Sequence, residues 1–230
     1  MNASILKTVN ESKENLVIAS EKSEAPFRGR GRPRLFDRAE ALSRALPLFW
    51  EQGYEGTSMA QLTAALGINA PALYSAFGSK EALFREVVGL YFSDGVGFNP
   101  TIYFDEPTAY DVVERILYEA AAAYTATTHP RGCMVATGML GCAPEHRSIA
   151  SEIAEFRRAT KKALEIRFRE ARLSGDLLAD TDVASLAGFC MAVLQGLSVQ
   201  ARDGADYESL KHVAAAALHT IRAASTSIAS

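Results

Sequence analysis

Two histidines and two cysteines form an approximately mirrored set in the middle of the chain. His129 precedes Cys133 by four positions, and the same spacing separates Cys142 from His146. Two thiolate sulfurs with two imidazole nitrogens are a common ligand set for zinc. A proline lies inside each pair, so neither pair shares one uninterrupted helix, and the spacing gives no sign that the four side chains converge. The sequence therefore predicts no metal site and no cofactor.

Cys133 has chemistry of its own, because a deprotonated thiol is a nucleophile. Arg131 lies two positions before it and a helix is expected to begin after it, and both features favour the thiolate. A second interpretation is a buried small hydrophobic residue. A third pairs Cys133 with His129 in a cysteine-dependent enzyme. The chain has no Gly-rich phosphate loop, no nucleophile elbow and no paired carboxylates beside a histidine, so the sequence favours a protein that is not an enzyme.

A different chemistry, contact with DNA, is indicated upstream between Thr57 and Phe84. This stretch reads as two short helices joined by a glycine turn, followed by the start of a third helix. Ser58 and Gln61 form a capping-box pattern that starts the first short helix, and Gly67 ends it. Asn69 is the expected N-cap of the second. This layout is typical of a helix-turn-helix motif, whose second helix enters the major groove.

The outward edge of that second helix carries small side chains and one tyrosine, Tyr74. Small side chains let a helix approach base edges in a groove about 12 Å wide, and a tyrosine hydroxyl can donate to a phosphate oxygen. Lys80 begins the next helix, where a cation and free backbone N–H groups suit another phosphate. The residues predicted to contact DNA here are Thr57, Ser58, Gln61, Asn69, Ala70, Ala72, Tyr74, Ser75 and Lys80.

The cations of the chain gather beside this motif, although the formal net charge is -3. Residues 28–92 carry eight Lys and Arg against six Asp and Glu, whereas residues 93–230 carry thirteen against seventeen. Four arginines alternate with Gly and Pro before the first helix, and such a basic arm can bind phosphates or enter a minor groove; the alternative is a solubilising linker. These arginines are Arg28, Arg30, Arg32 and Arg34. Residues 1–27 lack sustained periodicity and are expected to form a disordered tail.

The stretch from about Phe36 to Phe92 resembles the tetracycline-repressor-type transcriptional regulators. The family signature runs from a glycine turn through a Leu-Tyr pair and a Phe to a Lys-Glu pair. It is matched here by Gly67, Leu73, Tyr74, Phe77, Lys80, Glu81 and Leu83, with Phe49, Gly53, Tyr54, Thr57 and Leu62 upstream. Pro47 departs from the pattern and is expected to kink the first helix, because it removes a backbone hydrogen bond. The resemblance implies a repressor that binds a double-stranded DNA operator.

Helical patterns continue to the C-terminus, so the predicted fold is all-α. A three-helix DNA-binding domain with its basic arm occupies residues 28–92, and a helical effector-binding and dimerisation domain occupies residues 93–230. Helices are expected near residues 37–52, 80–92, 109–127, 133–142, 148–173, 182–202 and 207–223. The first two of these flank the helix-turn-helix, and the last two are the most apolar.

In the resembled family, the last two helices of each subunit form a four-helix dimer interface. That implies a homodimer here, in which two reader helices meet a pseudo-palindromic operator. The expected interface residues are Val183, Leu186, Ala187, Cys190, Leu194, Leu197, Leu210, Val213, Ala214, Ala217 and Ile221, and the small residues Gly188, Ala192, Gly196, Ala215 and Ala216 allow close approach. The alternative is that these stripes complete the core of a single chain.

The resemblance also implies a pocket for an unknown small-molecule effector in the C-terminal domain. Its expected walls are Tyr118, Tyr124, Cys133, Met134, Met139, Phe156 and Phe189. The segment around Cys133, HPRGCM, resembles that of electrophile-responsive members of the family, so a thiol-based electrophile or redox sensor is an alternative to a noncovalent effector.

The remaining features predict a cytoplasmic protein without a membrane partner. The N-terminus carries charges among short apolar patches and has no secretory signal pattern. The longest uncharged run, from Val183 to Ala201, contains glutamines and an apolar stripe, which favours a packed helix over a membrane span. Three cysteines, an odd number, suggest a reducing compartment.

Overall fold

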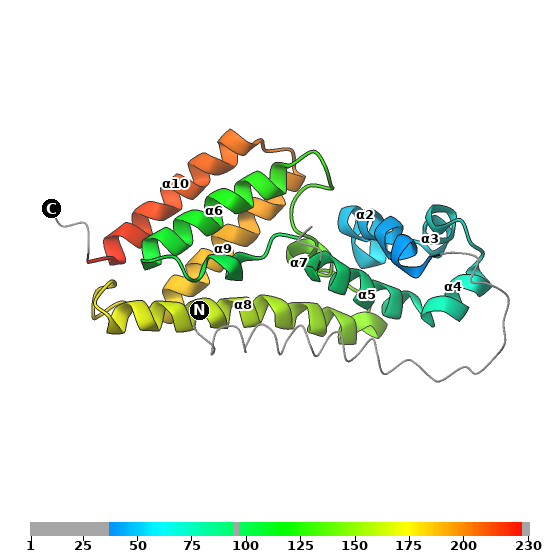
Figure 1. Ribbon diagram of the computed structural model, residues 1–230, viewed down its shortest axis with the longest axis horizontal. Coiled ribbons are helices and arrows are strands. Elements are labelled where there is room, and N and C mark those ends of the chain that lie inside the picture. Colours follow the sequence, from blue (N-terminus) through cyan, green and yellow to red (C-terminus); the bar gives the residue numbers. More distant parts are fainter. Residues whose placement is uncertain (1–36, 94–96, 227–230) are drawn as a thin grey trace.

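The computed structural model describes residues 37–93 and 97–226, and every regular element in these ranges is a helix apart from one isolated bridge between Leu177 and Ser225. The all-α prediction is confirmed. The predicted tail of residues 1–27 and the arginine arm (Arg28, Arg30, Arg32 and Arg34) lie outside the described residues. Figure 1 shows α2, α3 and α4 at one end of the molecule and α6, α9 and α10 at the other, with α8 running along the second group.

The helix bounds agree with the predicted ranges to within a few residues, except in the segment after Cys133. The DNA-binding part contains α2 (Arg38–Gly56), α3 (Met59–Leu66), α4 (Ala70–Phe77) and α5 (Lys80–Ser93). The larger part contains η1 (Pro100–Tyr103), α6 (Ala109–Thr125), α7 (Met134–Thr137), η2 (Pro144–His146), α8 (Arg147–Leu173), α9 (Val183–Arg202) and α10 (Tyr207–Ala224). The helix expected over residues 133–142 is only the four-residue α7.

Helix α2 is interrupted at Gly53. This residue has φ 71° and ψ 178°, values that an L side chain rarely adopts, and a Cβ atom there would lie 2.9 Å from the carbonyl oxygen of Gly138. Pro47 lies inside the same helix, yet Gly53 is the residue with non-helical angles. The helical angles thus continue through Pro47, which is exposed, and depart from the helix six residues later.

The helix-turn-helix forms from local signals. The Ser58 hydroxyl accepts a hydrogen bond from the Gln61 backbone N–H, and the Gln61 side chain accepts one from the Ser58 N–H, which completes the capping box. Gly67 ends α3 in the left-handed conformation. Asn69 caps α4 by accepting from Ala72 N–H at 2.9 Å. Buried Leu62, Leu66, Leu73 and Phe77 hold α3 and α4 against the rest of the DNA-binding part.

Helix α5 joins the DNA-binding part to the bundle. Its buried stripe of Leu83, Phe84, Val87, Val88 and Tyr91 packs on both. Arg85, on another face, donates two hydrogen bonds to Glu152 of α8 at 2.7 and 2.9 Å. A bidentate pair of this kind fixes orientation as well as distance, so α5 and α8 are held in register.

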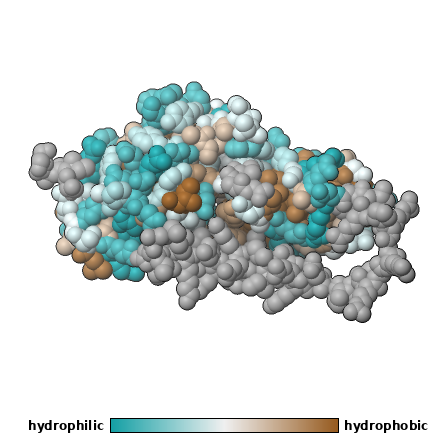
Figure 2. All heavy atoms as spheres, in the orientation of Figure 1, coloured by the Kyte–Doolittle hydropathy of each residue, from teal (hydrophilic) through white to brown (hydrophobic). Residues whose placement is uncertain are grey.

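Helix α9 lies within the bundle, in contact with α6, α8 and α10. By length and composition it is apolar enough to cross a membrane, but its most apolar stripe faces these three helices. The face shown in Figure 2 is mainly hydrophilic, and its hydrophobic residues gather in small patches instead of one broad band. In the described part of the chain, α9 is thus a core helix of the bundle.

Candidate DNA-binding and effector sites

Helix α4 presents a small, exposed surface. Tyr74 is 49% exposed and Ser75 is also exposed, whereas Ala70 and Ala72 are half-buried. Leu73 and Phe77, on the opposite side, are buried and anchor the helix. The outward edge of α4 therefore carries the short side chains and the one phenol that the sequence predicts for a groove-reading helix.

Thr57 is a correction to the predicted DNA contacts. Its side chain is fully buried, and its hydroxyl donates to the carbonyl oxygen of Gly53 at 2.7 Å and lies 3.3 Å from that of Leu48. The hydroxyl closes the end of α2 and cannot reach a phosphate. Three other predicted contacts, Ser58, Gln61 and Asn69, are exposed but already bonded within the protein as caps, and Gln61 also donates to Gln52 at 2.8 Å.

Lys80 lies at the start of α5 with its ammonium over the ring of Tyr54, 4.2 Å from the ring centroid. Partial burial lowers the pKa of Lys80, and the nearby Glu55 carboxylate opposes that change. Burial in turn raises the pKa of Tyr54 to about 12, so the phenol stays neutral. The Lys80 charge is thus held in place by a ring, which orients it but also gives the side chain a structural role.

A cavity of about 50 Å³ lies between α5, η1, α6, α7, α8 and α9. Tyr124, Cys133 and Phe156 of the predicted pocket line it. The other lining residues were not predicted: Phe92, Phe98, Pro100, Val135, Ala136, Arg157, Thr160, Met191, Leu194 and Gln195. Arg157 follows buried Ile153 by one helical turn, so continuing the inward stripe of α8 would have found it.

Four predicted pocket residues lie elsewhere. Met134 and Met139 are buried in the core, and Tyr118 packs against the core without lining the cavity. Phe189 lines a separate groove between the N-terminal end of α9 and the C-terminal end of α10. Periodicity predicts that these four side chains face inward, but it cannot distinguish a side chain packed in the core from one that lines a cavity.

The Cys133 sulfur is in contact with aromatic hydroxyls. The Tyr91 hydroxyl lies 3.2 Å from it, and Tyr124 is a second hydrogen-bonding neighbour. Burial raises the pKa of both phenols well above 10, and the proximity of Cys133 raises it further. The expected cation beside the sulfur is corrected: Arg131 turns away to donate to the carbonyl oxygen of Ala205, whereas Arg157 lies close enough to interact electrostatically with Cys133.

The mirrored cysteines and histidines each have other partners. The His129 ring stacks on Trp50 with 4.5 Å between centroids, and His146 Nδ1 lies 2.8 Å from a Glu55 carboxylate oxygen. Cys142 is half-buried. Among residues 37–93 and 97–226, no three His, Cys, Asp or Glu side chains form a group suited to a metal ion. The His129 Nδ1 lies 2.9 Å from the Pro130 carbonyl oxygen, and the Cys133 sulfur lies 3.2 Å from the Tyr91 hydroxyl, so each has another hydrogen-bond neighbour.

The helical bundle and the DNA-binding part meet at the broken end of α2. Because Gly53 interrupts the helix, the Tyr54 N–H donates to Gly138 at 3.1 Å, which leaves the Trp50 carbonyl oxygen without its helical partner. Arg202, the last residue of α9, donates to that oxygen at 2.8 Å and to the Glu51 carbonyl. A side chain of the bundle thus caps a helix of the DNA-binding part.

The residues predicted for the dimer interface lie mostly inside the single chain. All except Val213, which is half-buried, are buried within the single chain, so the stripe of α9 and α10 completes its own core. The small residues show the opposite pattern: Ala192 and Ala216 are exposed, and Gly188 and Gly196 are half-buried. A Cβ atom on Gly196 would meet nothing within 4 Å. The face left open by these helices is therefore the small-residue face.

Comparison with known proteins finds matches for both parts of the structure. Residues 41–87 match the model of the family described as bacterial regulatory proteins, tetR family, and residues 113–217 match the tetracyclin repressor-like C-terminal domain. The HTH-type transcriptional repressors ComR and BdcR, both from Escherichia coli (strain K12), are 31% and 32% identical. The alignments cover 87% and 90% of this chain and 96% and 98% of the relatives.

A solved structure extends the comparison. It contains the TetR family transcriptional regulator CifR, as a cysteine mutant complexed with 26-bp double-strand operator DNA. It is 41% identical, covers 82% of this chain and 98% of its own, and superposes with a TM-score of 0.76. The helix-turn-helix, the helical bundle and these similarities agree, and the chain belongs to the tetR family of bacterial regulatory proteins.

Proposed function

We propose that the protein is a homodimeric transcriptional repressor that binds a pseudo-palindromic DNA operator through α4 and is released by a small-molecule effector. The observation that carries this proposal is the exposed edge of α4, with Tyr74 and Ser75 outward and Leu73 anchoring the helix. The operator in the CifR complex and the repressor names of ComR and BdcR support it. The protein carries out no catalysis and acts in the cytoplasm.

The dimer proposal uses the small-residue face, which we define as Gly188, Ala192, Gly196 and Ala216. Residues without large side chains let helices from two subunits approach closely, and burial of this face would cover the outer sides of α9 and α10. Twofold symmetry then presents two α4 helices to half-sites about 34 Å apart. The boundaries 28–92 and 93–230 remain our proposed domain division.

Release follows from a shift in population. An effector that fits one arrangement of the cavity walls better than another stabilises that arrangement by the difference in its binding free energy. If the favoured arrangement changes the distance between the two α4 helices, they no longer match successive major grooves, and operator affinity falls. The hydrogen bonds from Arg202 to the Trp50 carbonyl and from the Trp50 indole to Gly132 are two of the contacts that join the bundle to α2.

The experiment that tests DNA binding is selection of genomic fragments on the purified protein, followed by sequencing and mobility-shift titration. Ser75→Glu places a carboxylate on the exposed edge of α4, where repulsion from phosphates should weaken binding by about tenfold or more. Ser151→Glu, on an exposed position of α8, is the matched control and should bind as the wild type does. Unchanged binding by Ser75→Glu would remove α4 from the interface.

A second candidate is favoured by one observation, the position of the Cys133 sulfur on the cavity wall beside the Tyr91 hydroxyl. In this version an electrophile or oxidant modifies the sulfur, and the added atoms occupy the cavity in place of a noncovalent effector. The two versions share the cavity and the release step. They differ in whether Cys133 is required for release.

A further inference from the structure

Arg157 is a cation without a counter-ion in the described part of the chain. It lies on α8, where its Nη1 donates to the carbonyl oxygen of Val135 at 2.8 Å. Its other two guanidinium nitrogens have no hydrogen-bond partner among the described residues. Arg157 is half-buried, and this partial burial lowers the pKa of its guanidinium. By contrast, Arg85 on α5 is paired with Glu152 through two hydrogen bonds.

Arg157 faces a cavity that is otherwise mostly apolar. Gln195 of α9 also lines this cavity, and its side-chain amide makes no hydrogen bond within residues 37–93 and 97–226. Arg157 and Gln195 are both half-buried, so each keeps part of its water, but a partly desolvated donor still gains from a polar partner. The apolar part of the wall includes Phe92, Phe98, Phe156 and Met191. Unused donors in an apolar wall are the features of a ligand site that orients one polar group.

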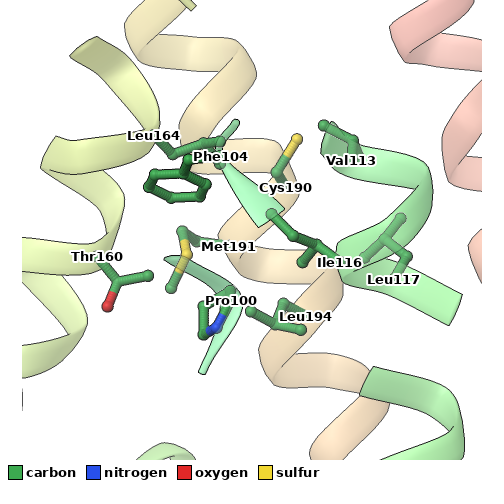
Figure 3. A pocket seen from close by; sticks show the side chains of 10 residues that line it. All are labelled: Pro100, Phe104, Val113, Ile116, Leu117, Thr160, Leu164, Cys190, Met191 and Leu194. Atoms are coloured by element: carbon green, nitrogen blue, oxygen red, sulfur yellow. The ribbon is translucent and has the colours of Figure 1, made fainter. Parts of the chain in front are cut away.

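A second, smaller cavity continues the apolar side. Its volume is about 10 Å³, and it shares Pro100, Thr160, Met191 and Leu194 with the first. Figure 3 shows the side chains of α6, α8, α9 and the η1 segment converging on it, with Cys190 and Leu164 beyond the shared residues. The two cavities together have room for only a few heavy atoms before the walls must move. The space therefore suits a short apolar body.

We propose that the effector is a small organic acid, whose carboxylate is bound by Arg157 and Gln195 and whose apolar body lies among the aromatic side chains of the cavity. The inference rests on the proposed function, because it names the chemical class of the effector of that repressor. A guanidinium fork matches a carboxylate geometrically, and an amide N–H donates to it. An inorganic anion would leave the apolar wall without a partner.

The test compares acids with their neutral amides. Isobutyrate, hexanoate and benzoate are titrated against the wild type at pH 7 beside isobutyramide, hexanamide and benzamide. Binding is measured by calorimetry and by the fluorescence of Trp50, the single tryptophan of the chain. At least one acid should bind about tenfold more tightly than its amide, since a charge-assisted hydrogen bond distinguishes them. Equal affinities, or no acid bound at about 10 mM, would overturn the proposal.

Variants test whether Arg157 and Gln195 cause the preference for acids over amides. Arg157→Gln should bring acid and amide to within about threefold of each other, and Gln195→Leu should weaken the acid without a change of charge. Arg158→Gln, an exposed neighbour that pairs with Glu155, is the matched control and should keep the wild-type preference. An acid preference that survives in folded Arg157→Gln and Gln195→Leu contradicts the assignment, as does inorganic phosphate binding as tightly as the acids.

Operator binding is measured separately for each protein without any acid. If the wild type binds acids selectively but no DNA, the proposed function fails while the acid site stands. If it binds DNA but shows no preference for acids, the repressor stands and the effector class is wrong.

Discussion

The indole nitrogen of Trp50 donates a hydrogen bond to the carbonyl oxygen of Gly132 over 3.1 Å. Gly132 immediately precedes Cys133, so this bond joins α2 of the DNA-binding part to the segment whose residues Cys133, Val135 and Ala136 line the cavity. The indole also stacks on His129 and meets the Tyr91 ring edge-to-face. The buried Trp50 side chain thus joins α2 to the segment before α7 through its indole N–H and to α5 through its ring.

Trp50→Phe should lower the free energy of unfolding by about 1 to 3 kcal/mol, because it leaves the buried Gly132 carbonyl without its donor and removes ring contacts. Urea unfolding followed by circular dichroism measures this. Ile102→Ala, which truncates a side chain that is 65% exposed, should cost less than about 0.5 kcal/mol. Equal stabilities of Trp50→Phe and the wild type would show that the hydrogen bond contributes nothing to the junction.

Tyr74→Phe should weaken operator binding by about 1 to 3 kcal/mol with little change in stability, because the hydroxyl is exposed and makes no bond within the described protein. Fluorescence anisotropy with the selected operator gives the affinity. The control, Tyr207→Phe, removes a hydroxyl at the start of α10, far from the reader, and should leave affinity unchanged. If Tyr74→Phe binds as well as this control, the phenol does not contact a phosphate.

Ala192→Glu should convert the dimer to a folded monomer. The side chain is exposed in the single chain, so a carboxylate is tolerated there, but in a symmetric interface it would be buried twice without a partner. Light scattering gives the mass and circular dichroism the helix content. The control, Ala122→Glu at an exposed position of α6, should remain dimeric. A dimeric Ala192→Glu would exclude the small-residue face, whereas a charge at buried Leu194 would report only on folding.

Cys133→Ser separates covalent from noncovalent release. If thiol modification releases DNA, N-ethylmaleimide should release the wild type and Cys142→Ser but leave Cys133→Ser bound. Cys190 should stay unmodified at pH 8, because burial raises its pKa to about 12 and keeps the thiol protonated. Mass spectrometry of the treated proteins locates the label. Release of Cys133→Ser at the wild-type rate would rule out the sensor version.

The parts of the structure that could be predicted from the sequence are those set by local chemistry. The capping atoms of Ser58 and Asn69 and the left-handed Gly67 act within four residues, so their pattern is readable in one stretch of sequence. The bounds of α8, α9 and α10 follow equally from periodicity and caps.

The parts that could not be predicted depend on which distant element covers a face. The stripe of Leu186 and Leu194 is buried as its periodicity predicts, but the helices that pack against α9 are α6, α8 and α10 of the same chain. The cation near Cys133 is Arg157 from α8 instead of its sequence neighbour Arg131, because the chain turns Arg131 toward Ala205. Periodicity reports that a side chain is inside, and three-dimensional packing alone decides what it meets.

Arg202 gives α9 a mechanical role. The helix has 20 residues, about 30 Å in length, and an α-helix resists compression along its axis. Its middle carries most of the small-residue face proposed for subunit contact, and Arg202 at its C-terminal end donates to the carbonyl oxygens of Trp50 and Glu51 in α2. A displacement of α9 along its axis by a fraction of its pitch would therefore displace α2 by nearly the same distance. In the proposed dimer, α9 would act as a rigid connection between the subunit contact and the DNA-binding part. A small displacement of α9 could then reach α4 without being amplified.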